Sequence, residues 1–178
     1  MSKKTLTLVA AAFALAACRT PPPRPWLRFE LDGVTGLQPK EPGAFAGDLL
    51  GARLRVDLYD PKTAVLVVVD NPTDASVRVS LGPDAGDPRN AIGEVLLRRL
   101  DGPAVGGPDM QAYAARQPLA VDGGWRATFY LDAPLGREPK LGQYLVLAIE
   151  AETDAAARVR YTLPLIAKMG GTRPTGLR

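Results

Sequence analysis

The chain has 178 residues, with 22 Lys or Arg against 19 Asp or Glu and a formal net charge of +3. Without Lys3 and Lys4, which lie in an N-terminal segment unlike the rest, 20 basic residues face 19 acidic ones, and this balance argues against nucleic-acid binding. The chain has no histidine and one cysteine, Cys18, which excludes Ser-His and Cys-His catalysis as well as zinc sites built from these ligands.

Residues 1–17 have the layout of a secretory signal peptide. Lys3 and Lys4 precede an apolar run from Leu6 to Ala17. A charged start, an apolar stretch of about a dozen residues and small residues at its end are typical of a segment that is cleaved during export. The run is shorter than the roughly 20 residues of a membrane-spanning helix. We therefore expect residues 1–17 to be absent from the mature protein.

The end of this segment reads Leu15, Ala16, Ala17 and Cys18. These residues resemble the lipobox of bacterial lipoproteins. The resemblance implies that the Cys18 sulfur receives a diacylglyceryl group and that the new N-terminal amine is acylated. Two or three acyl chains hold a protein on a membrane essentially permanently. The alternative is an ordinary secretory peptide with an incidental cysteine.

The lipobox resemblance also implies a location. We expect a lipid-anchored protein of the bacterial cell envelope, with the membrane as its first partner and no cofactor besides the lipid on Cys18. Residue Arg19 stands where inner-membrane lipoproteins of enterobacteria carry an aspartate. This difference favours the outer membrane, with the protein facing the periplasm or the cell surface.

A proline-rich segment follows the cysteine. Residues 19–25 read RTPPPRP, and a polyproline II segment rises about 3.1 Å per residue, so residues 18–25 are expected to form a semi-rigid tether on the order of 20 Å long. We expect one domain over 26–166 and a flexible tail over 167–178. The 17 prolines and 18 glycines, with little helical periodicity, predict short strands joined by turns.

Eight segments of the domain are predicted as strands, because their apolar residues alternate with polar ones or run on over a strand's length. In chain order they are 26–31, 53–58, 64–69, 77–81, 91–100, 125–131, 144–150 and 158–165. The run 64–69 lacks alternation, so we expect a central strand covered on both faces. The last two strands are expected to pair. This spacing predicts a single antiparallel β-sandwich of about 7–9 strands.

The connections are predicted from their turn residues. Residues 33–50 read as a Pro/Gly-rich connection, and the turn 70–74 is expected to return strand 64–69 onto 77–81 as a hairpin. Two longer loops are candidates for function, the second with one helical turn near 109–115; they are 82–90 and 101–117.

Two stretches carry a resemblance that supports this architecture. VLVVVDNPTDASVRVSL at 65–81, followed by LAVDGGWRATFYL at 119–131, resembles the Asn-Pro-Thr hairpin and glycine-strand pairing of immunoglobulin-like domains in bacterial surface lipoproteins. The resemblance implies an immunoglobulin-like sandwich and names no activity. Four alternating residues of the second stretch are expected to face inward: Trp125, Ala127, Phe129 and Leu131.

Aspartates in the turns have two interpretations. Asp84 and Asp87 carry the oxygen ligands that calcium takes in a flexible loop. Their spacing does not fit the D-x-D-x-D-G pattern, so we favour the alternative that they cap turn amides, and we expect no metal. The same interpretation holds for Asp70 and Asp74.

Several arginines occupy strand positions that face away from the predicted core. They are Arg53, Arg55, Arg78, Arg98, Arg126, Arg158 and Arg160. A guanidinium binds phosphate or carboxylate through parallel N–H groups, so neighbouring strands can gather these residues into one anion-binding face. The alternative, which we favour, is a solvated sheet on which they pair with acidic residues, namely Glu30, Asp57, Glu94, Glu150 and Glu152.

Three functions follow from these observations. The first is a non-enzymatic lipoprotein whose sandwich binds or scaffolds another envelope component, a protein, through loop ends or a free sheet edge. The second is a binding module for an anionic envelope polymer or lipid headgroup, with steep salt dependence. The third, a hydrolase with two carboxylates about 5 to 9 Å apart, is the least favoured.

Few other side chains offer chemistry or a contact surface. Ser76 and Ser80 are the serines beyond the signal peptide, and both take outward positions on a predicted strand. Trp26 and Tyr113 lie off the alternating core faces and are the aromatic candidates for a contact surface. Packing beneath a loop is their alternative.

Overall fold

The computed structural model describes residues 27–58, 65–90, 96–102, 111–132 and 140–169, all within the unit Leu27–Gly170. The predicted signal peptide, Cys18, the tether and Trp26 lie outside these residues.

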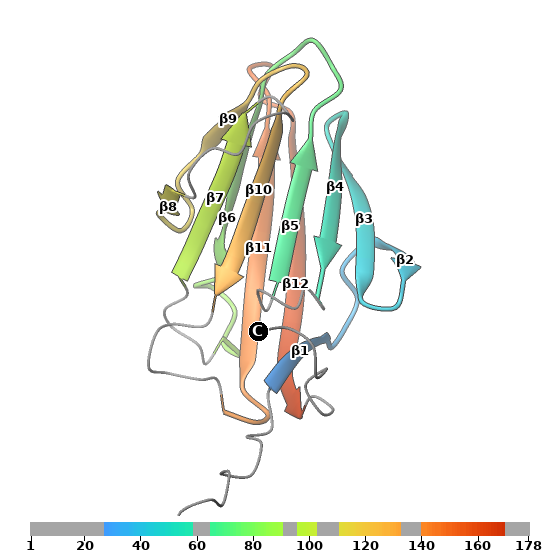
Figure 1. Ribbon diagram of the computed structural model, residues 1–178, viewed down its shortest axis with the longest axis vertical. Helices are drawn as coiled ribbons and strands as arrows, with labels where there is room; N and C mark the ends of the chain where they lie inside the picture. Colours follow the sequence, from blue (N-terminus) through green and yellow to red (C-terminus); the bar gives the residue numbers. More distant parts are fainter. Residues whose placement is uncertain (1–26, 59–64, 91–95, 103–110, 133–139, 170–178) are drawn as a thin grey trace, which may run out of the picture. The chain divides into compact units, whose positions relative to one another are not determined.

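The described residues form twelve strands and no helix. Five strands make one sheet, in the spatial order β1 (Leu27–Leu31), β12 (Arg158–Met169), β11 (Tyr144–Glu152), β6 (Val77–Pro83) and β9 (Leu119–Val121). Seven make the other, in the order β2 (Gln38–Glu41), β3 (Ala44–Leu49), β4 (Ala52–Asp57), β5 (Val65–Asp70), β10 (Arg126–Asp132), β7 (Leu96–Gly102) and β8 (Gln111–Tyr113). Neighbouring strands are antiparallel throughout (Figure 1). The prediction of an all-β, antiparallel fold is confirmed.

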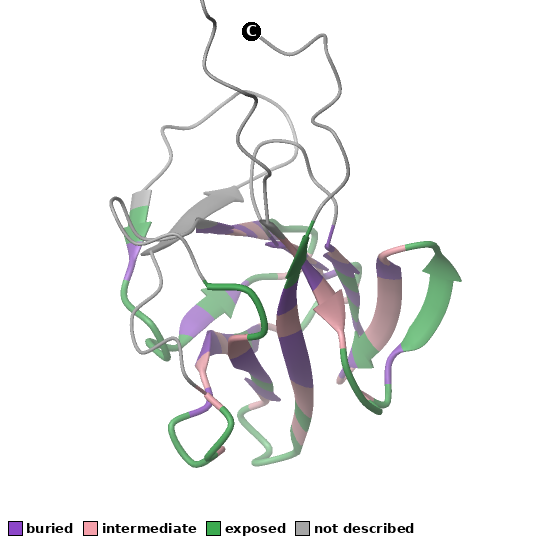
Figure 2. Cartoon of the chain, turned by 90° about the horizontal axis from the view of Figure 1, so that it is seen from below, coloured by how far each residue is buried: buried purple, intermediate pink, exposed green. Residues whose placement is uncertain are grey.

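Both sheets contribute to one apolar core. Because successive side chains of a strand point to opposite faces, strands such as β4 and β5 bury every second residue, and buried purple segments alternate with other segments along ribbons of Figure 2. Core residues of the seven-stranded sheet include Val56, Val67 and Phe129, and those of the five-stranded sheet include Val79, Leu147 and Leu163. The half-buried strand predicted over 53–58 matches β4, in which Leu54 and Val56 are buried while Arg53 and Arg55 are exposed.

Strand β5 lies at the centre of the seven-stranded sheet, between β4 and β10. Val65, Val67 and Val69 are buried, whereas Leu66 and Val68 on the other face are half-buried. The predicted central position is correct, but the predicted coverage of both faces is wrong. An unbroken aliphatic run shows that a strand tolerates burial on both faces. Whether both faces are buried depends on how the sheet packs.

The chain between β5 and β6 crosses from one sheet to the other. Since β5 pairs with β4 and β10 while β6 pairs with β11 and β9, the predicted hairpin of these two strands is wrong. Asn71 holds the crossing. Its fully buried side chain donates to the carbonyls of Ala75 and Val121, at 2.8 Å each, and accepts from the Thr73 amide at 3.1 Å. One side chain therefore ties the end of β5 to β9 of the opposite sheet.

Gly123 packs against the same turn. A Cβ atom at this position would lie 2.5 Å from the Thr73 carbonyl oxygen and 2.9 Å from the Asp74 Cα atom. Backbone cannot yield as a flexible side chain does, so this contact requires glycine.

Two segments predicted as connections contain strands. Residues 33–50 include β2 and β3, and the predicted helical turn near 109–115 is instead β8. The described residues thus hold more strands than the 7–9 expected. The missed strand β2 is exposed at all four positions, and β8 has three residues, so neither shows the apolar alternation that reveals a strand in a sequence.

Two aromatic residues differ from expectation. Tyr113 is buried and its ring meets that of Phe129 edge-to-face, with centroids 5.1 Å apart, so it belongs to the core and does not form a contact surface. Trp125 was expected to face inward with Ala127, Phe129 and Leu131, but it precedes β10 and is 40% exposed. The inward face of β10 therefore begins at Ala127.

The pairing predicted for the last two strands is confirmed. Strands β11 and β12 form an antiparallel hairpin in which Glu152 lies opposite Arg158. Strand β12 continues to Met169, so its last three residues fall in the segment assigned from sequence to the tail.

Candidate functional site: a charged groove on the five-stranded sheet

A groove of ≈ 560 Å³ lies on the outer face of the five-stranded sheet. Its lining comes from strands β6, β11 and β12 and from the segment before β9: Arg78, Ser80, Arg116, Pro118, Glu150, Ala151, Glu152, Arg158, Val159 and Arg160. Three of the arginines predicted for an outward face, Arg78, Arg158 and Arg160, are thus brought together.

The strand register arranges these charges in rows across the sheet. Glu152 of β11 lies between Arg78 of β6 and Arg158 of β12. In the next row, two residues along, Glu150 lies between Ser80 and Arg160. Residues directly opposite on antiparallel strands interact through their side chains, so the central strand supplies acids to basic neighbours on either side.

The first row is an ion-pair chain. Arg78 Nε lies 3.3 Å from Glu152 Oε1, and Arg158 Nη2 lies 3.4 Å from Glu152 Oε2. Arg78 also reaches Asp154 in the turn after β11, with 3.0 Å between Nη2 and Oδ1. Each guanidinium has five N–H donors, more than these ion pairs use.

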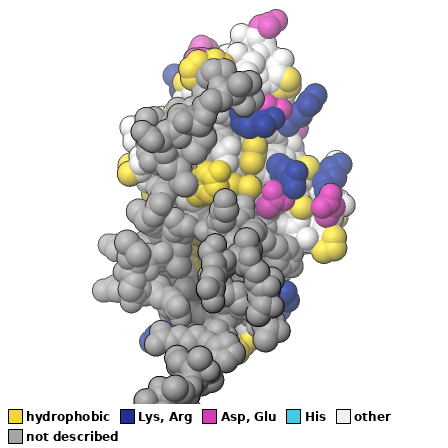
Figure 3. Space-filling model, viewed as in Figure 1, with side chains coloured by type: hydrophobic (Ala, Val, Ile, Leu, Met, Phe, Trp, Pro, Cys, Tyr) yellow, Lys and Arg dark blue, Asp and Glu magenta, His cyan; other side chains and the backbone are white. Residues whose placement is uncertain are grey.

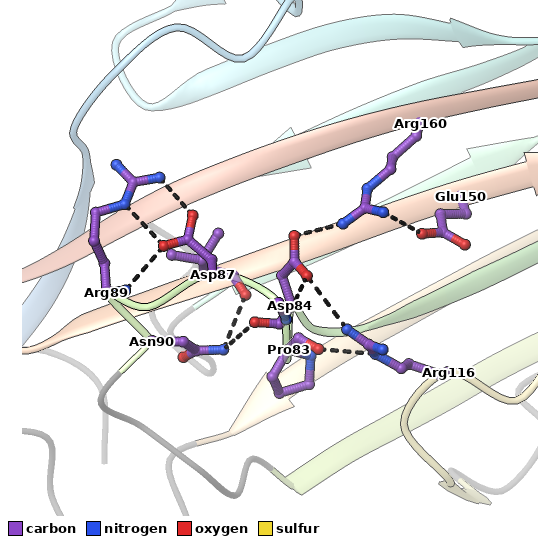
Figure 4. Close-up of polar contacts among 10 residues, drawn as sticks. Pro83, Asp84, Asp87, Arg89, Asn90, Arg116, Glu150 and Arg160 are labelled. Atoms are coloured by element: carbon purple, nitrogen blue, oxygen red, sulfur yellow. Dashed lines mark hydrogen bonds and ion pairs between the residues drawn. The ribbon is translucent and has the colours of Figure 1, made fainter.

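The second row is joined to Asp84 through Arg160. Arg160 bonds Glu150 through Nη1, at 3.2 Å from Oε1, and Asp84 through Nη2 (Figure 4). On the other side of Asp84, Arg116 Nη2 lies 3.5 Å from Oδ1, and Arg116 Nε donates to the Pro83 carbonyl at 2.9 Å. One carboxylate thus fixes two arginines that belong to different segments.

Asp84 is one of two buried polar side chains among the described residues. Its Oδ1 also accepts from the Gly86 amide at 3.1 Å, so the predicted capping of a turn amide is confirmed. Within the described part of the chain, no three acidic, Cys or His residues gather at a place that could hold a metal ion. The Asp84 carboxylate is shared by the ion pairs with Arg116 and Arg160.

We expect Asp84→Ala to lower the free energy of unfolding by about 2 kcal/mol, because hydrogen bonds to charged groups contribute about 1.5–3 kcal/mol and two arginines lose their shared partner. Asp154→Ala is the matched control: the Asp154 side chain is 91% exposed and that of Asp84 is 13% exposed. The control should change stability by about 0–0.5 kcal/mol. Urea denaturation measures both, and equal effects would contradict the central role of Asp84.

The charges around the groove balance. Four arginines, Arg78, Arg116, Arg158 and Arg160, are paired with four acids, Glu150, Glu152, Asp84 and Asp154. This matches the favoured interpretation of cross-strand pairs for Glu150 and Glu152. A polyanion lying in the groove would gain contacts to the guanidinium groups and meet repulsion from the two glutamates.

The remaining arginines of the predicted face lie on the other sheet. Arg53 and Arg55 belong to β4 and Arg126 to β10, so the seven residues do not form one surface. Arg55 pairs with Asp57 at 2.9 Å and Arg126 with Asp70 at 3.5 Å. Basic and acidic side chains are accordingly interspersed in the view of Figure 3. The side chain of Arg98 and the residue Glu94 lie outside the described part.

The loop after β6 contains a second ion pair. The Arg89 guanidinium donates to Asp87 through Nη2 at 2.7 Å and Nε at 3.0 Å, and its carbon atom Cζ lies 6.0 Å from the centre of the Tyr144 ring. These side-chain hydrogen bonds, with one from the Arg89 backbone amide, lower the pKa of Asp87 to about 2. Asp87 therefore caps a turn amide, as predicted.

Arg89→Ala should raise the pKa of Asp87 toward the ordinary 3.8, leaving it somewhat lower because a backbone amide still bonds the carboxylate. Because the pKa of Asp87 is lower in the folded chain than in the unfolded chain, this carboxylate stabilises the fold at pH values above the unfolded pKa of 3.8. The contribution is lost as the pH falls from about 4 through 2. A carbon NMR titration of the Asp87 carboxyl measures the pKa. An unchanged value in Arg89→Ala would show that Arg89 is not the cause.

Arg116 of the groove, and the arginine partners of Asp84, were missed from sequence. Arg116 has a left-handed backbone with φ of 66° in the turn before β9, and its amide donates to Leu81 in β6 at 2.8 Å, which directs the side chain over the sheet. Asp84 was noted as a turn residue without its arginine partners. Only the high content of arginine hinted at these pairs, since no local pattern joins residues 84, 116 and 160.

Comparisons with known proteins found no matching family model, no matching curated protein and no matching solved structure. The described part of the chain contains no helix with the length and apolar character to cross a membrane.

Proposed function

We propose that this chain is a lipid-anchored, non-enzymatic protein of the bacterial envelope, and that its sandwich, of the immunoglobulin-like kind, binds another envelope protein in the charged groove. The observation that carries the proposal is the pair of ion-pair rows across β6, β11 and β12. The lipobox at residues 15–18 supports the anchor, and two antiparallel sheets around one core support the immunoglobulin-like architecture.

A protein is the ligand that fits a balanced groove. Partners at protein interfaces present complementary potentials, and this lining presents both signs in alternation at fixed positions. A partner segment with its own acidic and basic side chains can exchange pairs with Arg158 and Glu152, whose side chains are 78% and 37% exposed. A polymer that carries only negative charge lacks the basic groups that would pair with the glutamates of the groove.

The sheet edges fit a partner less well. Strand β2, one edge of the seven-stranded sheet, carries Pro39 and Lys40 and a register shift, which are features that protect an edge from pairing. The opposite edge, β8, and the edge strand β9 each have three residues. We therefore place the binding surface in the groove and not at these three edges.

The test uses a photo-reactive amino acid in intact cells of the source bacterium. It is placed at Ser80, inside the groove, or at Thr128, a half-buried position of β10 in the other sheet. A single protein cross-linked from Ser80 and not from Thr128 supports the proposal. Equal or absent products from both positions would contradict it.

The anchor is tested separately with Cys18→Ser, which removes the sulfur that carries the lipid. We expect the native chain in the membrane fraction and Cys18→Ser in the soluble fraction. Equal distribution of the two would contradict the lipobox interpretation.

An anionic polymer remains the second candidate, favoured by the convergence of four arginines on one groove. Binding of inorganic polyphosphate to the purified chain, measured at 50 and 300 mM salt, separates it from a protein partner. A steep loss of affinity with salt, abolished by Arg158→Ala with Arg160→Ala, would favour the polymer.

A further inference from the structure

Three strand ends meet at one end of the domain. In Figure 1 β1 begins, β11 begins and β12 ends at the lower end. The register places Leu27, the first residue of β1, opposite Met169, the last residue of β12. A hydrogen bond of 2.8 Å from the Gly142 amide to the Ala167 carbonyl brings the turn before β11 to the same end.

This end exposes apolar side chains. Among the described residues, four large apolar side chains are exposed, and two of them are here: Leu141, 63% exposed, and Met169, 51% exposed. Scattered exposed apolar residues are common. These two share one end, and a turn holds Leu141 out toward solvent.

The turn that carries Leu141 is fixed by two hydrogen bonds. The Gln143 amide donates to the Lys140 carbonyl at 3.0 Å, and the Lys140 amide donates to the Gln143 side-chain oxygen at 2.8 Å. Gly142, with φ of 81°, takes the left-handed position that this turn requires. Leu141 therefore stays at the tip of a fixed turn.

Lysines flank the apolar pair. Lys140 precedes Leu141 and is exposed, and Lys168 precedes Met169 with a side chain 52% exposed and paired with Glu30 at 2.9 Å. Apolar side chains beside lysines are typical of protein surfaces that lie in a membrane interface. The apolar groups enter the boundary between headgroups and acyl chains, and the lysines contact anionic lipids.

The chain's connectivity points to the same surface. Eight residues separate Cys18 from Leu27, which even fully extended span about 30 Å. A lipid on Cys18 thus confines the end of the domain at Leu27 to the neighbourhood of the bilayer, where a short linker produces a high effective concentration.

We propose that the basal patch, formed by Lys140, Leu141, Lys168 and Met169, lies on the anionic lipid surface to which Cys18 anchors the chain. This inference rests on the lipid anchor of the proposed function. It sets the orientation of the domain: the turn of Asn71–Ser76 lies beyond the far end of β11, since Arg78 pairs with Glu152 there, and points away from the bilayer.

The test uses the full lipidated chain, whose other residues include no cysteine. A polarity-sensitive fluorophore is attached to Leu141→Cys or, as the distal control, to the exposed position in Asp74→Cys. On vesicles of phosphatidylglycerol and phosphatidylcholine we expect at least a twofold rise in emission for Leu141→Cys and none for Asp74→Cys. Lys140→Glu in the Leu141→Cys chain should remove most of the difference between mixed and pure phosphatidylcholine vesicles.

The outcomes separate the patch from the anchor. If the chain sediments with vesicles but the fluorophore at position 141 does not respond, the patch is disproved while the anchor stands. If the native chain does not sediment, the anchor fails as well. A cross-link from position 141 to an envelope protein, without a response to vesicles, would assign this end to a protein and overturn the proposal.

Discussion

Phe129→Ala lowers the free energy of unfolding by about 3–5 kcal/mol, because removing a fully buried aromatic side chain loses its transfer free energy and leaves a cavity. Phe129 lies on β10, an interior strand of the seven-stranded sheet, opposite Val67 of β5. Its ring packs edge-to-face on Tyr113, whose hydroxyl accepts from the Leu81 amide in the other sheet at 3.2 Å. The substitution therefore also loosens a link between the two sheets.

The neighbouring residue provides the control. Tyr130 lies on the same strand with its side chain on the opposite, half-buried face. Tyr130→Ala should lower the free energy of unfolding by about 1 kcal/mol, the centre of the distribution for point mutations. Guanidinium denaturation of the unlipidated chain, carrying Cys18→Ser throughout, measures both. Equal losses would show that the core does not lie on the Phe129 face of β10.

Asn71→Ala should lower the free energy of unfolding by about 2–4 kcal/mol, because leaving each buried polar group unpaired costs about 1–3 kcal/mol. The side chain is fully buried, and its loss leaves the Ala75 and Val121 carbonyls without their amide donor. The Thr73 hydroxyl, which donates to Asn71 at 2.7 Å, keeps only the Ala75 carbonyl, at 3.1 Å, as an acceptor.

The control for Asn71 lies in the same turn. Asp74 is exposed, and Asp74→Ala should change the stability by less than about 0.5 kcal/mol. Asn71→Asp tests the donor function, because a carboxylate still accepts from Thr73 but cannot donate to the two carbonyls. We expect it to be at least as damaging as Asn71→Ala. A stable Asn71→Asp protein would contradict the role assigned to the amide group.

The turn after β5 shows how local signals mislead. Asp70, Asn71 and Pro72 form a polar, proline-containing turn between two apolar runs, which is the usual signature of a hairpin. The same residues also suit a crossing between sheets, because the Asn71 amide can donate to the Ala75 carbonyl in the turn and to the Val121 carbonyl in β9. Val121, fifty residues further on, decides between the two arrangements.

The arginines show a second limit. Alternation predicts correctly that Arg53, Arg78 and Arg160 point away from the core. It does not tell which outer face they share, because a sandwich has two of them, and the order of strands divides these residues between both. The groove therefore depends on the adjacency of β6, β11 and β12.

The sequence by itself determined the strand class, most strand positions, the inward residues of β4 and β10, and the pairing of β11 with β12. These features follow from periodicity within a few residues, where the side-chain direction is set by the pleat. The tertiary structure decided the crossing at Asn71, the burial of Tyr113, and the meeting of Asp84 with Arg116 and Arg160. Such contacts join residues far apart in the chain, and they exist only once the two sheets have packed.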